Sequence, residues 1–379
     1  MRRRTLTYFC NCLNHHLIGV CDEIHKQLGD DFKFVVTKRY DISSLKGGED
    51  YNTIRNYCIR AYEGIDEKKV AQDLARYSDV CVFGSDSLDY MKIRAKEAPS
   101  GLSLEGGERW LKRGMKNIIS PSLLKWWTTY HLYCRKANFY YLSASAYAYQ
   151  DLLKLGAYKN RCFKWGYFVD IDKNYVIKGN QQTANGIMWC ARFLDWKHPE
   201  IPVELAALLK RSGYQFSLDM YGDGIERQRI EQLISDLHVE DVVTLKGSMP
   251  NDEIQKAMRE HSIFLFTSDR REGWGVVAGE AMGNGCALVA CKEIGCVPYL
   301  VEDGKTGLTY EKDNKHELYE KVKLLLENPS KLKEIRIGGN LNMKQLWNPQ
   351  SAVDALLNLI EELIDGRPCS ITLGPCSKA

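Results

Sequence analysis

The chain has 379 residues, enough for two domains of ordinary size, and 44% of them are hydrophobic, which excludes a chain that is disordered by composition. Its 52 basic and 49 acidic residues nearly balance, which argues against a dedicated nucleic-acid-binding protein. No apolar run reaches the roughly 18 residues of a membrane-spanning helix, and the N-terminus is predicted to begin a strand rather than a signal peptide.

The cysteines give no sign of a metal site or a disulfide framework. Thirteen of them are scattered along the chain, and no two form a Cys-x-x-Cys pair. A zinc site or a set of disulfides would need closer, paired spacing. We therefore expect reduced thiols in a cytoplasmic protein. Because no Asp-x-Asp motif stands at the end of a predicted strand, a bound divalent metal is not expected.

The N-terminal half is predicted to alternate strands with helices. A buried strand at 5–10 is followed by a polar loop at 11–16 and a helix at 17–28. Further apolar runs predict strands at 32–36, 78–83 and 139–143. Strands separated by helical stretches pair in parallel through crossover connections.

The C-terminal half repeats this alternation more clearly and predicts a doubly wound α/β domain, whose loops lie at the carboxyl ends of its strands. Strands are predicted at 186–190, 216–220, 242–245, 263–266 and 286–290, and helices at 202–210, 227–237, 252–259, 276–282, 316–326 and 351–364.

These patterns predict three segments. An N-terminal domain covers 1–170, a C-terminal domain covers 171–350, and a crossover helix with a tail covers 351–379. The hinge is predicted near 165–185, where the regular pattern lapses. The last residues, 366–379, are predicted to be frayed.

The stretch with the richest chemistry joins a strand to a helix. Gly273 and Gly275 let the backbone approach a ligand, and the helix that follows offers free N–H groups to an anion such as a diphosphate. Glu272 precedes this helix, and Glu280 lies inside it on roughly the same side. Carboxylates pair well with hydroxyls, which indicates sugar and ribose partners. The alternative is that Glu272 only favours the helix start and that Glu280 is solvated.

Basic residues and glycines follow neighbouring strands of the same predicted sheet. Arg192 could hold a diphosphate in a forked grip, and Lys197 could hold it as a point charge, although basic loop residues are usually solvated. The turn Tyr221-Gly-Asp-Gly224 lacks a full Gly-x-Gly-x-x-Gly pattern, so a nicotinamide enzyme is not supported. The residues Lys246–Met249 end the next strand at a comparable place, where a nucleobase could be held.

Together these motifs resemble the donor half of retaining glycosyltransferases of family 4. The resemblance covers about 186–308 and rests on Arg192-x4-Lys197, Tyr221-Gly-Asp-Gly224, Glu272-Gly-x-Gly-x4-Glu280 and Val301-Glu-Asp-Gly-x-x-Gly307. It implies the GT-B fold, which consists of two Rossmann-like doubly wound α/β domains facing across a cleft.

The resemblance also implies a role for each matching residue. Arg192 and Lys197 would neutralise the leaving nucleotide diphosphate, Glu272 would bind donor-sugar hydroxyls beside the reacting carbon, and Glu280 would hold the ribose. The other donor-binding positions would contact sugar, phosphate and base: Gly273, Trp274, Gly275, Val276, Gly222, Gly247, Ser248 and Met249.

The chain departs from the family pattern in two places. Gly295-Cys-Val-Pro-Tyr299 stands where family members often carry Gly-Gly-x-x-Glu, and Leu142-Ser-Ala-Ser145 stands where an acceptor-loop histidine is usual. The remaining acceptor-side candidates follow strands of the N-terminal half: His15, His16, Ser85 and Asp86. For the histidines, the alternative is an ordinary loop side chain satisfied by its neighbours.

One N-terminal feature is independent of the resemblance. From Arg109 to Gln150 the chain has seven basic residues and no acidic one, with Trp110, Trp126, Trp127, Tyr130 and Tyr133 interleaved. Basic and aromatic residues on one helical surface suit an anionic membrane interface. The alternative is that the aromatic residues belong to the core and the basic residues form a solvated face.

The sequence therefore predicts a retaining glycosyltransferase of surface-polysaccharide synthesis. Its donor would be a nucleotide sugar, expected to be a UDP-sugar, and its acceptor a glycan or a polyprenyl-linked sugar reached at the inner face of the plasma membrane. No nucleic-acid partner and no cofactor are expected. A nucleotide-sugar epimerase of GT-B fold and a non-catalytic nucleotide-sugar-binding module are the alternatives.

Overall fold

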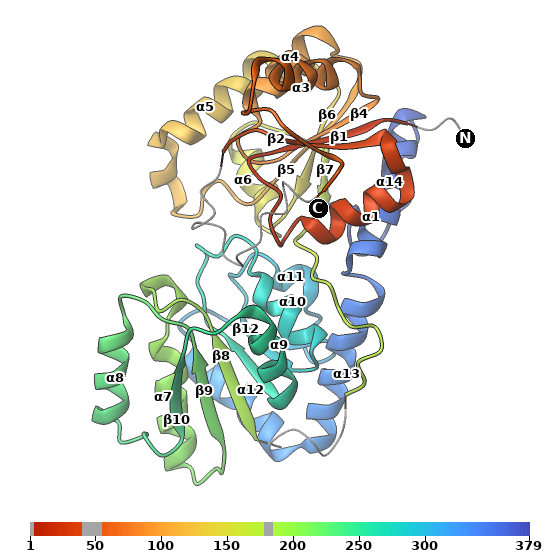
Figure 1. The fold of residues 1–379 in the computed structure, drawn as a ribbon. Coiled ribbons are helices and arrows are strands. Elements are labelled where there is room, and N and C mark those ends of the chain that lie inside the picture. The colour runs from red at the N-terminus through yellow and green to blue at the C-terminus, as the bar shows by residue number, and fades with distance from the viewer. Residues whose placement is uncertain (1–3, 40–54, 178–184) are drawn as a thin grey trace. The chain divides into compact units, whose positions relative to one another are not determined.

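The computed structural model describes residues 4–39, 55–177 and 185–379. The chain forms two compact units, and each is described by itself (Figure 1). Unit 1 contains Met1–Asp170 and Pro349–Ala379, and unit 2 contains Ile171–Asn348. The part of the predicted hinge at 178–184 lies outside the described residues.

Unit 1 is built on a seven-stranded sheet with the order β3-β2-β1-β4-β5-β6-β7. All its pairings are parallel, so both faces must be covered, and this explains why β1 and β4 are entirely buried. The strands are β1 (Leu6–Cys10), β2 (Phe32–Val36), β3 (Cys58–Arg60), β4 (Val80–Phe83), β5 (Leu102–Gly107), β6 (Phe139–Ser143) and β7 (Cys162–Lys164).

The last helix of unit 1 follows unit 2 in the chain, and the others return the chain between parallel strands. The helices of unit 1 are α1 (Ile18–Leu28), α3 (Ile65–Tyr77), α4 (Leu88–Glu97), α5 (Pro121–Thr129), α6 (Ala148–Lys154) and α14 (Pro349–Ile364), with 3₁₀ turns η1 (Gly29–Asp31) and η3 (Gly114–Ile119) and a π turn η4 (Tyr130–Cys134). Ala352, Leu356 and Leu359 lie on one buried stripe of α14. The helix packs beside α1, and Arg4 and Glu361 form an ion pair of 2.7 Å.

The tail is ordered, so the prediction of a frayed C-terminus is wrong. Lys164 N donates to Ser377 O at 2.7 Å, Ala379 N donates to Cys162 O at 3.2 Å, and Cys376 is fully buried. Since β7 is an edge strand, its outer backbone groups need partners, and the tail supplies them through an antiparallel bridge at Phe163.

The stretch 109–150 does not form one helical surface, because it divides among η3, α5, η4 and β6. The interfacial interpretation is wrong for Trp126 and Tyr130, which are only 1% and 6% exposed and belong to the core. Trp127 is 39% exposed and donates from Nε1 to Leu155 O. Arg109 is also buried, in an ion pair with Asp151.

Unit 2 is built on a six-stranded parallel sheet with the order β10-β9-β8-β11-β12-β13. Its strands are β8 (Gly186–Cys190), β9 (Ser217–Tyr221), β10 (Val243–Gly247), β11 (Ile263–Phe266), β12 (Ala287–Cys291) and β13 (Leu308–Tyr310). Its helices are α7 (Glu200–Arg211), α8 (Arg227–Asp236), α9 (Asn251–Glu260), α10 (Val276–Gly283), α11 (Val297–Leu300), α12 (Lys315–Glu327) and α13 (Pro329–Gln345), with a 3₁₀ turn η5 at Asp195–Lys197.

Each sheet has one switch point, where the direction of winding reverses. In unit 1 the switch lies between β1 and β4, and in unit 2 it lies between β8 and β11. Ligands of doubly wound sheets bind outside the carboxyl ends of the strands at such points. A ligand site is therefore expected in the loops that follow these four strands.

Candidate active site

The loops after β8 and β11 bring two predicted catalytic residues together. Lys197 and Glu272 form a close ion pair, and their side chains are only 12% and 13% exposed. Ser268 donates from Oγ to Glu272 at 3.1 Å. Arg192 is exposed, and among the described residues no group pairs with its side chain. An anion could therefore engage Arg192 without displacing a protein partner.

The two loops are tied to each other through the backbone. Trp189 Nε1 donates to Thr267 Oγ1 at 2.8 Å, and the same hydroxyl donates to Lys197 O at 2.7 Å. Asp269 N donates to Trp196 O at 3.0 Å. The position of the Lys197 backbone is thus set by residues that come directly after β11.

Gly275 shapes the start of α10. Its φ is +92°, and a Cβ there would lie 2.5 Å from the ring of Phe266. Only glycine fits this conformation and this contact. Gly273 and Trp274 are buried beside it, and α10 begins at Val276, so the first turn of α10 can offer N–H groups to a phosphate.

Glu280 lies in α10 and is not an ordinary solvated residue. Burial raises the pKa of its carboxyl to about 7, although a hydrogen bond with Asn251 at the start of α9 opposes the shift. The carboxyl group is close enough to the end of β8 to influence the thiol of Cys190. This place suits the predicted contact with a ribose.

The predicted base-binding positions lie in the loops after β9 and β10. Gly222 N donates to Gly247 O at 2.8 Å. Gly222 has a φ of +121°, and a Cβ there would lie 1.9 Å from Ala191 O, so the loop packs directly on the end of β8. Ser248 and Met249 are exposed beyond this turn.

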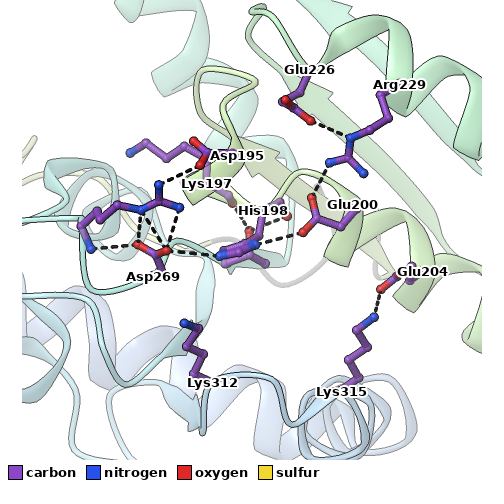
Figure 2. A network of polar contacts seen from close by, with 12 residues as sticks. Asp195, Lys197, His198, Glu200, Glu204, Glu226, Arg229, Asp269, Lys312 and Lys315 are labelled. Atoms are coloured by element: carbon purple, nitrogen blue, oxygen red, sulfur yellow. Dashed lines mark hydrogen bonds and ion pairs between the residues drawn. The ribbon is translucent and has the colours of Figure 1, made fainter. Parts of the chain in front are cut away.

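Sequence reasoning missed a charged network beside Lys197. His198 lies between the carboxylates of Glu200 and Asp269 (Figure 2). Asp269 also pairs with Arg271, and Glu200 pairs with Arg229. His198 carried no signal in the sequence, because its φ of +52° and its contact with Asp269 depend on the folded loops.

Three of the four acceptor-side candidates line a cavity of about 970 Å³ at the switch point of unit 1. His16, Ser85 and Asp86 line this cavity, whereas His15 is exposed beside His16 and is not among the lining residues. Asp86 forms a 2.7 Å ion pair with Lys38, which also lines it. Burial lowers the pKa of His16 to about 4, so this ring is neutral at pH 7.

The cavity also has lining residues that sequence reasoning missed. Glu105 on β5 accepts hydrogen bonds of 2.5 Å from Trp126 Nε1 and from the Tyr158 hydroxyl, and burial raises the pKa of Glu105 to about 7. Other missed residues bring aromatic rings and cations: Tyr8, Lys68, Tyr90, Arg109, Trp110, Lys112, Lys125, Tyr141, Trp165 and Tyr167. Rings, carboxyl groups and ammonium groups around one hollow suit a polar, hydroxyl-bearing ligand.

Comparison with solved structures defines the fold class. The structure of HepE from Anabaena in complex with UDP matches with a TM-score of 0.68 at 16% sequence identity, over 96% of this chain and 100% of that one. The two parallel-sheet units are therefore those of the GT-B fold, as the sequence predicted.

A family match lies in the C-terminal half of the chain. Residues 170–340, nearly all of them in unit 2, match the family described as glycosyl transferases group 1. Membership in family 4 stays a prediction.

Two curated relatives are similar over part of the chain. An uncharacterized glycosyltransferase of Methanocaldococcus jannaschii is 31% identical over 51% of this chain and 52% of its own length. A putative colanic acid biosynthesis glycosyltransferase of Salmonella typhimurium is 31% identical over 31% of this chain and 30% of its own length. The chain thus spans about half or less of the length of these relatives.

Proposed function

We propose that the protein transfers a sugar from a UDP-sugar to a glycan acceptor, with retention at the anomeric carbon, during surface-polysaccharide synthesis. The observation that carries this proposal is the pairing of Lys197 with Glu272 at the switch point of unit 2, ahead of the start of α10 and in the same loop as Arg192, whose side chain has no partner within the described part of the chain. The UDP in the Anabaena structure and the colanic acid relative support the choice of donor and pathway class.

The chemistry follows from charge development on the donor. When the bond to the anomeric carbon breaks, negative charge builds on the departing diphosphate. Arg192, Lys197 and the first N–H groups of α10 can stabilise that charge from fixed positions. A diphosphate on Lys197 would also free the Glu272 carboxylate to accept hydrogen bonds from the sugar hydroxyls.

A transfer assay with a panel of nucleotide sugars tests this proposal. Thermal shift first selects the nucleotide that stabilises the protein, because a ligand that binds only the folded state raises its melting temperature. NMR of the product then reports the anomeric configuration. Inversion would contradict retention. Turnover without acceptor would instead indicate an epimerase, and donor binding without any turnover would indicate a binding module.

We also propose that unit 1 docks on an anionic membrane that carries a lipid-linked acceptor. The side chains that support this are not the core tryptophan and tyrosine but Met115, Ile118, Ile119 and Leu124, which are exposed along η3 and α5. Ile119 is 88% exposed. Among the described residues, no helix is both long and apolar enough to cross a bilayer.

The charges of this segment, which we call the η3–α5 patch (residues 113–125), complement anionic lipid. Arg113, Lys116 and Lys125 are exposed on it, and Lys125 also lines the cavity of unit 1. Each basic residue near an anionic surface contributes about 1 kcal/mol, which salt screens within a Debye length. The apolar side chains can enter the interface while these cations meet the headgroups.

Vesicle co-sedimentation is expected to show stronger binding to anionic than to neutral vesicles at low salt. Changing Arg113 and Lys116 to Glu should reduce that binding at least tenfold, because two attractive charges become repulsive. The same change at Lys26 and Lys33, which lie outside the patch, serves as the matched control. Equal binding of the wild-type protein to anionic and neutral vesicles would exclude the docking.

A further inference from the structure

The imidazole of His198 joins two elements of unit 2 that are distant in sequence. Its Nδ1 lies 2.9 Å from Glu200 at the start of α7, and its Nε2 lies 3.5 Å from Asp269 in the loop after β11 (Figure 2). A neutral imidazole carries only one N–H, so it can donate to one side only. At 3.5 Å the contact of Nε2 with Asp269 is an ionic approach and not a hydrogen bond, and Nε2 has no hydrogen-bond partner among the described residues. Only the imidazolium, which is positively charged, is attracted to both carboxylates at once.

The two carboxylates that pair with this ring are themselves held in place by arginines. Asp269 forms an ion pair of 3.0 Å with Arg271, and Arg271 forms a second ion pair of 2.7 Å with Asp195. On the Nδ1 side of the ring, Glu200 forms an ion pair of 2.9 Å with Arg229. Arg229 pairs in turn with Glu226. We call these seven residues the His198 network.

The electrostatic setting favours the charged ring. The carboxylates of Asp269 and Glu200 raise the pKa of His198 to about 9, although partial burial opposes them. The ring is therefore an imidazolium at neutral pH. Since the ordinary value is 6.5, the stabilisation it gives is complete below about pH 6.5 and is lost as the pH rises through 9.

The network is adjacent to both members of the catalytic ion pair. Lys197 directly precedes His198, and Glu272 follows Asp269 by three positions. A backbone hydrogen bond from Asp269 to Trp196 already aligns the two loops. The contact of the imidazolium with Asp269 adds a charged link between the same two loops.

We propose that His198, as an imidazolium, is a positioning residue that clamps the loops after β8 and β11 and so holds Lys197 and Glu272 in place for the donor diphosphate. The inference rests on the proposed function for its ligand, but the clamp itself is a statement about the two loops. By linkage, a bound nucleotide that requires the clamp must raise the pKa of His198.

The test uses His198→Asn and His198→Gly. Asn and Gly both accept the left-handed backbone of this position, so these variants remove the ring without new strain. We expect about tenfold weaker UDP binding by calorimetry at pH 7.5. Wild-type affinity should fall as the pH rises from 8 to 10 more steeply than that of either variant, which retains Lys197. The His198 NMR titration midpoint should move upward when UDP is added.

Glu200→Gln gives a second, subtler test. It removes one of the two carboxylates while preserving the shape, so the midpoint of the pH profile should move to lower pH. A merely structural side chain would not shift a pH profile. His238→Asn is the matched control, because His238 is an exposed histidine with a φ of +54° in the same unit and should leave affinity and profile unchanged.

Two outcomes separate failure of the clamp from failure of the proposed function. Amide exchange at pH 7.5 needs no ligand, and protection of the 267–275 loop should fall in both His198 variants. Unchanged protection there overturns the clamp. A wild-type protein that binds no UDP overturns the proposed donor, while the exchange result still decides the clamp. UDP binding with equal affinity and pH profile in wild type and variants also overturns the inference.

Discussion

Replacing Arg192 or Lys197 with alanine is expected to lower kcat/KM by about 30- to 1000-fold, which corresponds to about 2–4 kcal/mol of lost transition-state stabilisation. The two residues lie in the loop after the first strand of unit 2, where Lys197 faces Glu272 and Arg192 has no side-chain partner in residues 4–39, 55–177 and 185–379. Both side chains follow the same strand, so both can meet the departing diphosphate from one loop. The measurement is steady-state kinetics with the donor selected by thermal shift.

The control for this prediction is Lys256→Ala. Lys256 is 71% exposed in a surface ion pair on α9, and such pairs contribute little. Its kcat/KM should equal that of the wild type. Lys197→Ala leaves the Glu272 carboxylate without its cation, so its unfolding must be compared with that of the wild type as well. Turnover within threefold of wild type in both Arg192→Ala and Lys197→Ala would remove these residues from the leaving-group role.

Glu272→Gln and Glu280→Gln are expected to separate turnover from nucleotide binding. Glu272→Gln should mainly lower kcat, because this carboxylate is assigned to the reacting sugar. This substitution should not weaken the binding of free UDP, because the loss of the negative partner leaves Lys197 more available to a diphosphate. Glu280→Gln should weaken UDP about tenfold, because the Glu280 carboxylate is assigned to the ribose hydroxyls. Calorimetry with UDP and steady-state kinetics measure the two effects.

The pH dependence of UDP binding sharpens this assignment. Burial raises the pKa of Glu280 to about 7, so the carboxylate that accepts ribose hydrogen bonds forms only as the pH rises through 7. The affinity of the wild-type protein for UDP should therefore increase between pH 6 and pH 8 by more than the affinity of Glu280→Gln. In the variant, only the ionisation of the nucleotide itself still changes over this range. A larger loss of UDP affinity in Glu272→Gln than in Glu280→Gln would mean that the two roles are reversed.

The sequence patterns predicted the strands correctly where the local preference of a segment agrees with its packing in the fold. Strands such as β8 and β11 are short apolar runs that are buried on both faces, and the observed bounds of the predicted strands lie within two residues of the expected ones. The residues that we assign to the donor could also be singled out from the sequence, because glycines and charged residues follow directly after the predicted strands; their roles stay predictions. In a doubly wound sheet this position alone puts them at the ligand-binding edge.

The helices and strands that the sequence did not predict contain residues that are explained only by contacts with distant segments of the fold. Strand β5 includes Glu105, whose charge is acceptable in a core only because Trp126 and Tyr158 donate to it from distant segments. Helix α13 contains Gly338 and Gly339, which interrupt a helical pattern. A Cβ at Gly338 would lie 2.3 Å from Lys305 O, so glycine is needed for a contact that only the folded chain makes.

The cavity of unit 1, to which we assign the acceptor, was the least predictable feature from the sequence. His16, Ser85 and Asp86 line the cavity as expected, since they follow the two strands at the switch point of unit 1. The rest of the wall comes from segments without a periodic signal, among them Trp110 and Lys112. Loop side chains of this kind are brought together by tertiary packing, which a single sequence does not reveal.

The interrupted course of unit 1 has a consequence for biosynthesis. Its sheet comes from the first 170 residues, but α14 and the segment that covers the edge of β7 come only after residue 348. Domains fold as units while the ribosome adds residues from the N-terminus. Unit 2 is therefore fully synthesised, and free to fold, before the C-terminal residues 349–379 that complete unit 1 have been made. During that interval the exposed flank of α1 and the open edge of β7 are the surfaces that a chaperone would have to shield.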